Sequence, residues 1–178
     1  MTSIEVTAPL ARAQKMADTA GLIAIIAAIA LGGSALVDIG AAAFRELKAL
    51  GPGREALGAV TGSLAGQWLL ALPSLIIALV LLDLRRVMAD YAAGRFFTRR
   101  ASAGVRKAGE GLLWAMAFAC IVSPTLYGFI VNGARGGPLD LRLEAFDLGL
   151  IALGAFIMVM GRALEAAAAI KAENDAII

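Results

Sequence analysis

The chain has 178 residues, of which 60% are hydrophobic and 17% charged, and its formal net charge is +2. A soluble domain averages about 45–50% apolar and about 25% charged residues, so this composition, with a mean hydropathy of +0.82, excludes an ordinary soluble globular protein. The sequence has no histidine and a single cysteine, Cys120, which excludes a Cys/His zinc site, an intrachain disulfide and a Ser-His-Asp triad.

Four apolar segments are long enough, or nearly so, to cross a bilayer. A helix rises about 1.5 Å per residue, so about 30 Å of hydrocarbon needs roughly 20 residues. The fourth segment is the weakest, because the uncharged stretch between Asp147 and Arg162 is short unless Arg162 extends toward the interface. The sequence predicts an all-α integral membrane protein with one domain over residues 1–178, a four-helix transmembrane bundle. Its expected spans are residues 19–37, 64–82, 111–134 and 146–168.

Two alternatives fit these segments less well. The first run is longer than the h-region of a signal peptide, about 7–15 residues, and Glu5 and Asp18 precede it, although residues 41–43 offer a cleavage site. Transmembrane strands are about 9–11 residues long and alternate in polarity, whereas these runs are continuous. Helices are expected because they satisfy every backbone polar group internally.

Lysine and arginine are distributed unevenly between the connections. The leader, the connection of residues 83–110 and the tail carry two, seven and two of them, against three and two in the other two connections. Cytoplasmic connections of membrane proteins are enriched in these residues. The sequence therefore predicts that both termini and the Arg-rich connection 83–110 face the cytoplasm.

The first outer connection, residues 38–63, has its own pattern. It contains a short amphipathic stretch, a Gly-Pro-Gly break and a new helix start. We expect a connector that lies on the membrane surface, and a lid over a ligand is the alternative.

Small residues recur at every fourth position in the first two spans. In lipid, helices associate through close backbone approach, which small residues permit. Because these spans run antiparallel, we expect Gly32 near Gly58 or Gly62, and Ala28 near Gly66. A homodimer face is the alternative use of the same residues. The predicted packing residues are Ala24, Ala28, Gly32, Gly58, Gly62 and Gly66.

Pro73 and Pro124 interrupt the second and third spans. Each removes an amide donor and frees the carbonyl four residues earlier, at Leu69 and Cys120. We expect a kink at each proline, either passive or opening a cavity of the kind that transporters use. Nearby hydroxyl groups can satisfy the freed backbone, namely those of Ser74, Ser123 and Thr125.

Charged residues are expected at the edges of the spans, not inside them. Ionisable side chains inside spans usually mark ion or proton paths, so the sequence argues against a coupled pump. A continuous polar path from Gln67 through Ser74 and Ser123 would instead favour a transporter or channel. The edge charges are Asp38, Asp83, Glu110, Asp147 and Arg162.

The segment YAAGRFFTRR, residues 91–100, joins the second and third spans. Gly94 is the expected left-handed end of one helix and Thr98 the N-cap of the next, with an incomplete capping box at Ala101. Basic and aromatic residues around this turn form a candidate surface for anionic lipid or a soluble protein, with a small-ligand site as the minor alternative. They are Arg85, Arg86, Phe96, Phe97, Arg99, Arg100, Arg106 and Lys107.

The C-terminal segment GRALEAAAAIKAENDAII, residues 161–178, continues the fourth span and ends acidic. Glu165, Glu173 and Asp175 are expected on the same side of the membrane as the basic connection. We predict that the tail lies against that connection through Glu173 and Asp175. Exposed ion pairs contribute little individually, so they would orient the tail.

Two segments together resemble a known family. YAAGRFFTRRASAGVRKAGEGLL has a glycine, a capped turn with Phe, a basic helix and a glycine before the third span, and the tail starts with glycine and ends acidic. Both are similar to the domain of unknown function 2975, a bacterial family of four-span membrane proteins. Asn174, Ala176 and Arg95 depart from its pattern. The matching positions are Gly94, Phe97, Gly109, Gly161, Glu173, Asp175 and Ile178.

The resemblance implies a multi-pass protein of the bacterial inner membrane without an assigned activity. Genes of the family often lie beside helix-turn-helix regulators, which implies a cytosolic protein partner. We expect a regulatory or interaction protein, with a small transporter, channel or lipid-binding protein as the alternative. An enzyme is not expected, since no base accompanies the intramembrane Ser, Thr and Cys. Expected partners are anionic lipids and a cytosolic protein, without cofactor, metal or direct nucleic-acid binding, and a homo-oligomer is left open.

Overall fold

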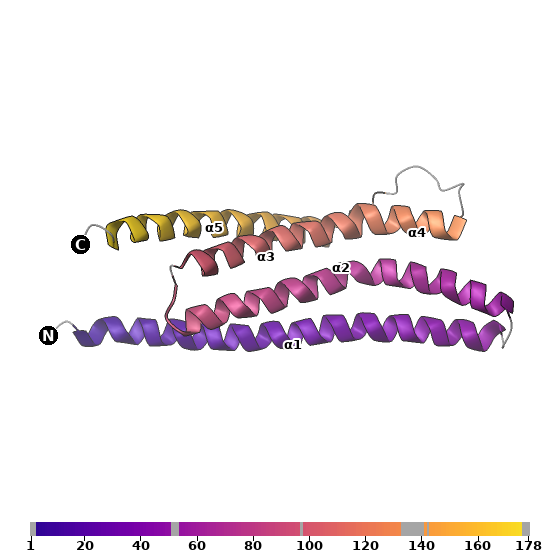
Figure 1. Cartoon of the computed structure of the whole chain (residues 1–178), viewed down its shortest axis with the longest axis horizontal. Coiled ribbons are helices and arrows are strands. Elements are labelled where there is room, and N and C mark those ends of the chain that lie inside the picture. Colours follow the sequence, from indigo (N-terminus) through magenta and orange to yellow (C-terminus); the bar gives the residue numbers. More distant parts are fainter. Residues whose placement is uncertain (1–2, 51–53, 97, 133–140, 142, 176–178) are drawn as a thin grey trace.

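The computed structural model describes residues 3–50, 54–96, 98–132, 141 and 143–175, and all of the regular structure in these ranges is helical (Figure 1). Within these ranges, four helical segments are long and apolar enough to cross a membrane, with α3, η1 and α4 together forming the third. This confirms the predicted all-α class and the prediction of four helices able to span a membrane. The elements are α1 (Ser3–Leu50), α2 (Arg54–Ala92), α3 (Arg99–Ala117), the π-helical segment η1 (Phe118–Val122), α4 (Ser123–Asn132) and α5 (Ala145–Asp175).

The helices pack in the order α1, α2, α3, α5. Helix α1 lies along α2, helix α2 also contacts α3, η1 and α4, and α5 lies along α3. Among the described residues, α1 has extended contacts with α2 alone. Figure 1 shows the two ends of the chain at the same end of the molecule. The arrangement is therefore open, and the outward faces of α1 and α5 have no protein neighbour within this part of the chain.

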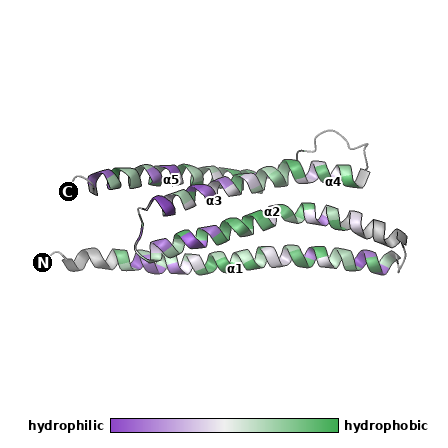
Figure 2. Ribbon diagram, in the orientation of Figure 1, coloured by the Kyte–Doolittle hydropathy of each residue, from purple (hydrophilic) through white to green (hydrophobic). Residues whose placement is uncertain are grey.

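Large apolar side chains cover these outward faces. Ile29 of α1 is 67% exposed and Phe156 of α5 is 63% exposed, and many similar side chains accompany them. Figure 2 shows hydrophobic residues along the middle of the helices. A monomeric soluble protein rarely exposes so many large apolar side chains side by side. The hydrocarbon core of a membrane accommodates them. The structure therefore indicates a multi-pass membrane protein.

A stripe of small residues holds α1 against α2, but in a register that differs from the prediction. Gly32 faces Ala78, with 4.0 Å between an added Cβ and that of Ala78, and Gly21 faces Met88 at 3.5 Å. The expected pairing of Gly32 with Gly58 or Gly62 is wrong. The stripe is buried at Ala17, Gly21, Ala24, Ala28, Ala35, Ile39 and Ala42.

The reason for the error is the length of α1. It continues to Leu50, and α2 begins at Arg54, so the chain reverses beyond the end of the first predicted span and every facing pair shifts. Residues 41–50 extend α1 and do not form a separate helix on the membrane surface, because Ile39 and Ala42 continue the packed stripe. The surroundings of Gly58 lie outside the described part.

The other glycines of the predicted ridge do not contact α1. Gly62 is exposed, and a Cβ added there meets nothing within 4 Å. Gly66 is buried against the ring of Tyr127 from α4, 3.0 Å from an added Cβ. Gly66 therefore packs α2 against the third span and not against the first.

The closest helix contact, which the sequence analysis did not predict, joins α3 to α5. A Cβ added to Gly109 would lie 2.8 Å from the carbonyl oxygen of Gly154 and from Cα of Met158. One added to Gly161 would lie 2.5 Å from Cα of Arg106. Cβ atoms do not approach backbone this closely, so both positions require glycine for α3 and α5 to touch.

Helix α3 meets α2 through two further glycines. A Cβ added to Gly111 would lie 2.5 Å from a methyl group of Val80, and one added to Gly104 would overlap a methyl group of Val87. Helix α3 thus presents small residues to both of its neighbouring helices, α2 and α5.

Replacing Gly161 with alanine should separate α3 from α5. The added methyl group meets backbone, which cannot move aside as a side chain can, so we expect the free energy of unfolding to fall by about 1–3 kcal/mol. Gly149→Ala on the same helix is the matched control, because a Cβ there meets nothing within 4 Å and alanine favours a helix by about 1 kcal/mol. Unfolding in detergent measures both. Equal stability of the two variants would show that the α3–α5 contact is looser than described.

Candidate functional site

The turn between α2 and α3 is built as predicted. Gly94 has a φ of +77° and its amide donates to the carbonyl of Tyr91 at 2.9 Å, which ends α2. The hydroxyl oxygen of Thr98 accepts from the amide of Ala101 at 3.2 Å and caps α3. A Cβ on Gly94 would lie 3.0 Å from Nε2 of Gln14, so the turn also packs against α1. The turn is thus fixed by the end of α2 at Gly94, by the cap of α3 at Thr98 and by the contact with Gln14 of α1.

The predicted cations around this turn divide into free and paired groups. Arg86 pairs with Asp83 at 2.5 Å, and Arg106 is engaged as described below. Phe96 is half-buried against Tyr91, with ring centroids 5.5 Å apart, and Phe97 lies outside the described residues. Four exposed cations have no ion-pair partner in the described part of the chain. This set, here called the basic surface, is Arg85, Arg99, Arg100 and Lys107.

The basic surface lies at one end of the apolar region. Figure 2 shows hydrophilic residues at the end of α2 and at the start of α3, at the end of the molecule where the chain begins and finishes. Arg95, next to the turn, pairs with Asp90 at 2.6 Å. The basic surface therefore lies next to arginines that are paired with a carboxylate, namely Arg86 and Arg95.

Arg106 joins α3 to α5 and does not belong to the free surface. Its Nε donates to Oε1 of Glu165 at 3.1 Å, and its Nη1 pairs with Glu110 one turn further along α3. Gly161 makes this possible, because its missing side chain lets the backbone of Arg106 approach α5. Planar guanidinium groups with two carboxylates form geometrically specific networks. This network orients α5 on α3.

The segment of residues 161–178 contacts the basic connection through Glu165, and not through Glu173 as predicted. Glu165 makes the contact, whereas Glu173 is exposed and has no partner in the described part of the chain. The side chain of Asp175 lies outside that part. Glu165 is placed by the glycine contact one turn earlier, and Glu173 has no comparable contact to bring it close.

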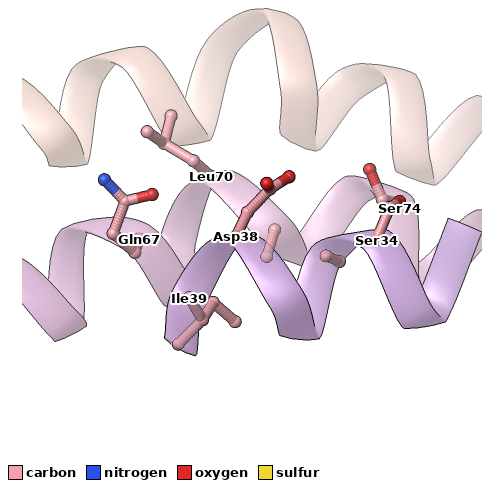
Figure 3. A pocket seen from close by; sticks show the side chains of 8 residues that line it. Ser34, Asp38, Ile39, Gln67, Leu70 and Ser74 are labelled. Atoms are coloured by element: carbon pink, nitrogen blue, oxygen red, sulfur yellow. The ribbon is translucent and has the colours of Figure 1, made fainter. Parts of the chain in front are cut away.

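A polar groove lies between α1 and α2, in the apolar region. Figure 3 shows the carboxylate of Asp38 between the amide of Gln67 and the hydroxyl groups of Ser34 and Ser74. The cavity has a volume of about 130 Å³. Apolar residues complete its wall, namely Ala35, Ile39, Leu70 and Ala71.

The depth of this groove corrects the expected position of Asp38. Its α2 wall, from Gln67 to Ser74, lies inside the apolar run 64–82. Asp38 therefore lies level with the middle of the second span and is exposed at the groove, although it follows the last residue of the first predicted span. The error has the same origin as the shifted register, since α1 continues well past residue 37.

Pro73 and Ser123 are connected through the backbone of α2. The hydroxyl of Ser123 donates to the carbonyl of Leu69 at 3.1 Å, and Ser123 is buried. This is the carbonyl that Pro73 leaves without its helical donor, so the predicted compensation by Ser123 is confirmed. Ser123 does not line the groove, which joins only Gln67 and Ser74 of the predicted polar path.

The backbone before Pro124 is also irregular. The amide of Ser123 donates to the carbonyl of Phe118 across the π-helical segment η1, and the hydroxyl of Thr125 donates to the carbonyl of Ile121 at 2.6 Å. Such π-helical turns often accompany functional positions. Here the turn places Ser123 against α2.

Comparison of the chain with protein families, curated proteins and solved structures finds no match. The similarity to the domain of unknown function 2975 therefore stays a prediction from the residues.

Ser123→Ala should lower the free energy of unfolding by about 0.5–1.5 kcal/mol, because the carbonyl of Leu69 loses its donor. Pro73→Ala restores an amide at position 73 that can donate to the same carbonyl. In the Pro73→Ala background the Ser123→Ala change should therefore cost clearly less, and a double-mutant cycle measures the difference. The same cost in both backgrounds would mean that the hydroxyl does not replace the missing amide.

Proposed function

We propose that this chain is an inner-membrane interaction protein of a bacterium, whose basic surface binds the headgroups of anionic lipids at the cytoplasmic face. In this proposal both termini are cytoplasmic. A soluble regulator, such as the helix-turn-helix protein that the family resemblance implies, would dock on the same surface. No catalytic step is proposed.

A line of three exposed side chains on α3 supports lipid binding. Arg100, Lys107 and Trp114 are spaced seven residues apart, which places them on one face of the helix. Trp114 is 73% exposed. Tryptophan favours the boundary between headgroups and hydrocarbon, so this line leads from solvent to the apolar region. A phosphate held by Lys107 would place the acyl chains of its lipid beside Trp114.

The number of unpaired cations sets the expected strength of the attraction between the basic surface and anionic lipid. Each basic residue near an anionic leaflet contributes about 1 kcal/mol, which corresponds to about a fivefold change in affinity. Paired side chains such as Arg86 contribute less, because Asp83 offsets their charge. The basic surface is therefore expected to select anionic over zwitterionic lipid without fixing one lipid in place.

The orientation is testable by labelling of single cysteines with a membrane-impermeant maleimide. With Cys120 replaced by alanine, we expect Lys48→Cys to react in intact spheroplasts. Arg100→Cys and Glu173→Cys should react only after the membrane is opened, because the positive-inside bias places them in the cytoplasm. All three positions are exposed. Labelling of Arg100→Cys in intact spheroplasts would reverse the proposed orientation.

Lipid selectivity is testable with brominated lipids that quench tryptophan. Trp68→Phe leaves Trp114 as the reporter, since the chain has two tryptophans. In reconstituted vesicles we expect brominated phosphatidylglycerol to quench Trp114 at lower fractions than brominated phosphatidylcholine. Arg100→Gln with Lys107→Gln should remove most of this preference, because two contributions of about 1 kcal/mol are lost.

The matched control is Arg45→Gln with Lys48→Gln, which removes two charges from the other end of α1. This control should keep the preference for the anionic lipid at Trp114. An equal loss in both double variants would mean that net charge, and not the basic surface, selects the lipid. An unchanged preference in the Arg100 and Lys107 variant would refute the proposal.

A second function, as a small transporter or channel, is favoured by the polar groove beside Asp38. An ionisable side chain at the depth of a span is costly and usually functional. The groove joins residues of two helices and holds a carboxylate that is not paired within the described chain.

A further inference from the structure

Asp38 lies far from both ends of the span it faces. Ala71, part of the same groove wall, is about 10 Å along α2 from Leu64 and about 18 Å from Asp83, at about 1.5 Å per residue. An arginine or lysine at this depth in the membrane can bring its charged end to the interface by extending its long side chain. The side chain of aspartate is too short for this. Its carboxylate therefore stays at the depth where the backbone places it.

No protein cation balances this carboxylate in the described part of the chain. Helix α2 carries no charged or titratable side chain between Leu64 and Leu82. On α1 the nearest are Arg45 and Glu46, and Nε of Arg45 donates to the carbonyl of Ala41. The third span contributes Cys120 and Tyr127, neither of which lines the groove.

An uncompensated carboxylate at this depth is unfavourable. Aspartate is among the residues least favoured in the middle of a membrane-spanning helix. A bound cation would remove most of this cost by neutralising the charge. The groove has room for one, since its 130 Å³ exceeds the space of about 30 Å³ that one water takes in the liquid.

The groups around the cavity are oxygen donors to a cation. Asp38 supplies a carboxylate, Gln67 an amide oxygen, and Ser34 and Ser74 hydroxyl oxygens (Figure 3). The hydroxyl of Ser34 donates its hydrogen to the carbonyl of Leu31 at 3.0 Å, which leaves its lone pairs available. Two helices thus place four oxygen-bearing side chains along one groove, with Asp38 between the others.

This set suits a small monovalent cation. Calcium requires six to eight oxygen ligands, often from several carboxylates, and magnesium requires a near-octahedral shell. One carboxylate with three neutral oxygen groups balances a single positive charge. We infer that the groove between α1 and α2 is an intramembrane binding site for a monovalent cation, Na⁺ or a proton, held on Asp38. This inference does not depend on lipid binding by the basic surface.

The site is testable on the purified full-length protein in detergent. We expect Na⁺, compared with choline at equal ionic strength, to raise the midpoint temperature of unfolding, because a ligand of the native state stabilises it. Asp38→Asn should abolish this rise. Ser34→Ala with Ser74→Ala keeps the carboxylate and should weaken the apparent affinity for Na⁺ about tenfold or more. Asp18→Asn, an exposed position on the same helix, is the matched control and should respond like the wild type.

A second readout separates the proton from the metal ion. If the bound cation is a proton, Na⁺ has no effect, and the infrared band of a protonated carboxylic acid is present in the wild type and lost in Asp38→Asn but not in Asp18→Asn. If it is Na⁺, the unfolding midpoint rises and the band is absent under saturating Na⁺. Neither a Na⁺-dependent rise nor an Asp38-dependent band would overturn the inference.

Discussion

Close approach of helix backbones is the constraint on which the rest of this structure depends. In hydrocarbon, apolar side chains gain little by leaving lipid for protein, so association relies on van der Waals contact between surfaces that fit. The α3–α5 contact meets this requirement at Gly109 and Gly161, where even a methyl group would overlap backbone. Helix α3 meets α2 at Gly104 and Gly111, where methyl groups of Val87 and Val80 occupy the space that a Cβ would need. The position of Arg106 beside α5 follows from the contact at Gly161.

The same contacts decide which cations remain free. Arg106 is drawn into a network with Glu110 and Glu165 because Gly161 brings α5 next to it. Lys107, the next residue, points away and stays exposed. Neighbouring residues of one basic helix thus serve different ends. Arg106 fixes the geometry of two helices, and Lys107 keeps a charge that has no ion-pair partner in the described part of the chain.

Local features of this fold could be predicted from the sequence, and features set by register could not. The helix end at Gly94 and the cap at Thr98 follow from conformational preferences of single residues. The four apolar helices follow from segment length and composition. The partner of Gly32 depends instead on where the chain reverses, and small residues at every fourth position permit several offsets. The depth of Asp38 and the pairing of Arg106 also depend on the offset between neighbouring helices. Neither could therefore be predicted from the local sequence.

The hydrogen bond from Ser123 to Leu69 has a consequence for biosynthesis. The two residues are 54 positions apart in the chain, so α2 leaves the ribosome well before its donor is made. Until the third span enters the bilayer, Pro73 leaves one carbonyl of α2 without the donor that Ser123 later supplies, and an unsatisfied polar group is unfavourable in hydrocarbon. Water or the insertion machinery must shelter that carbonyl in the interval. The second span can therefore reach its final environment only after the third has arrived, which couples the insertion of the two.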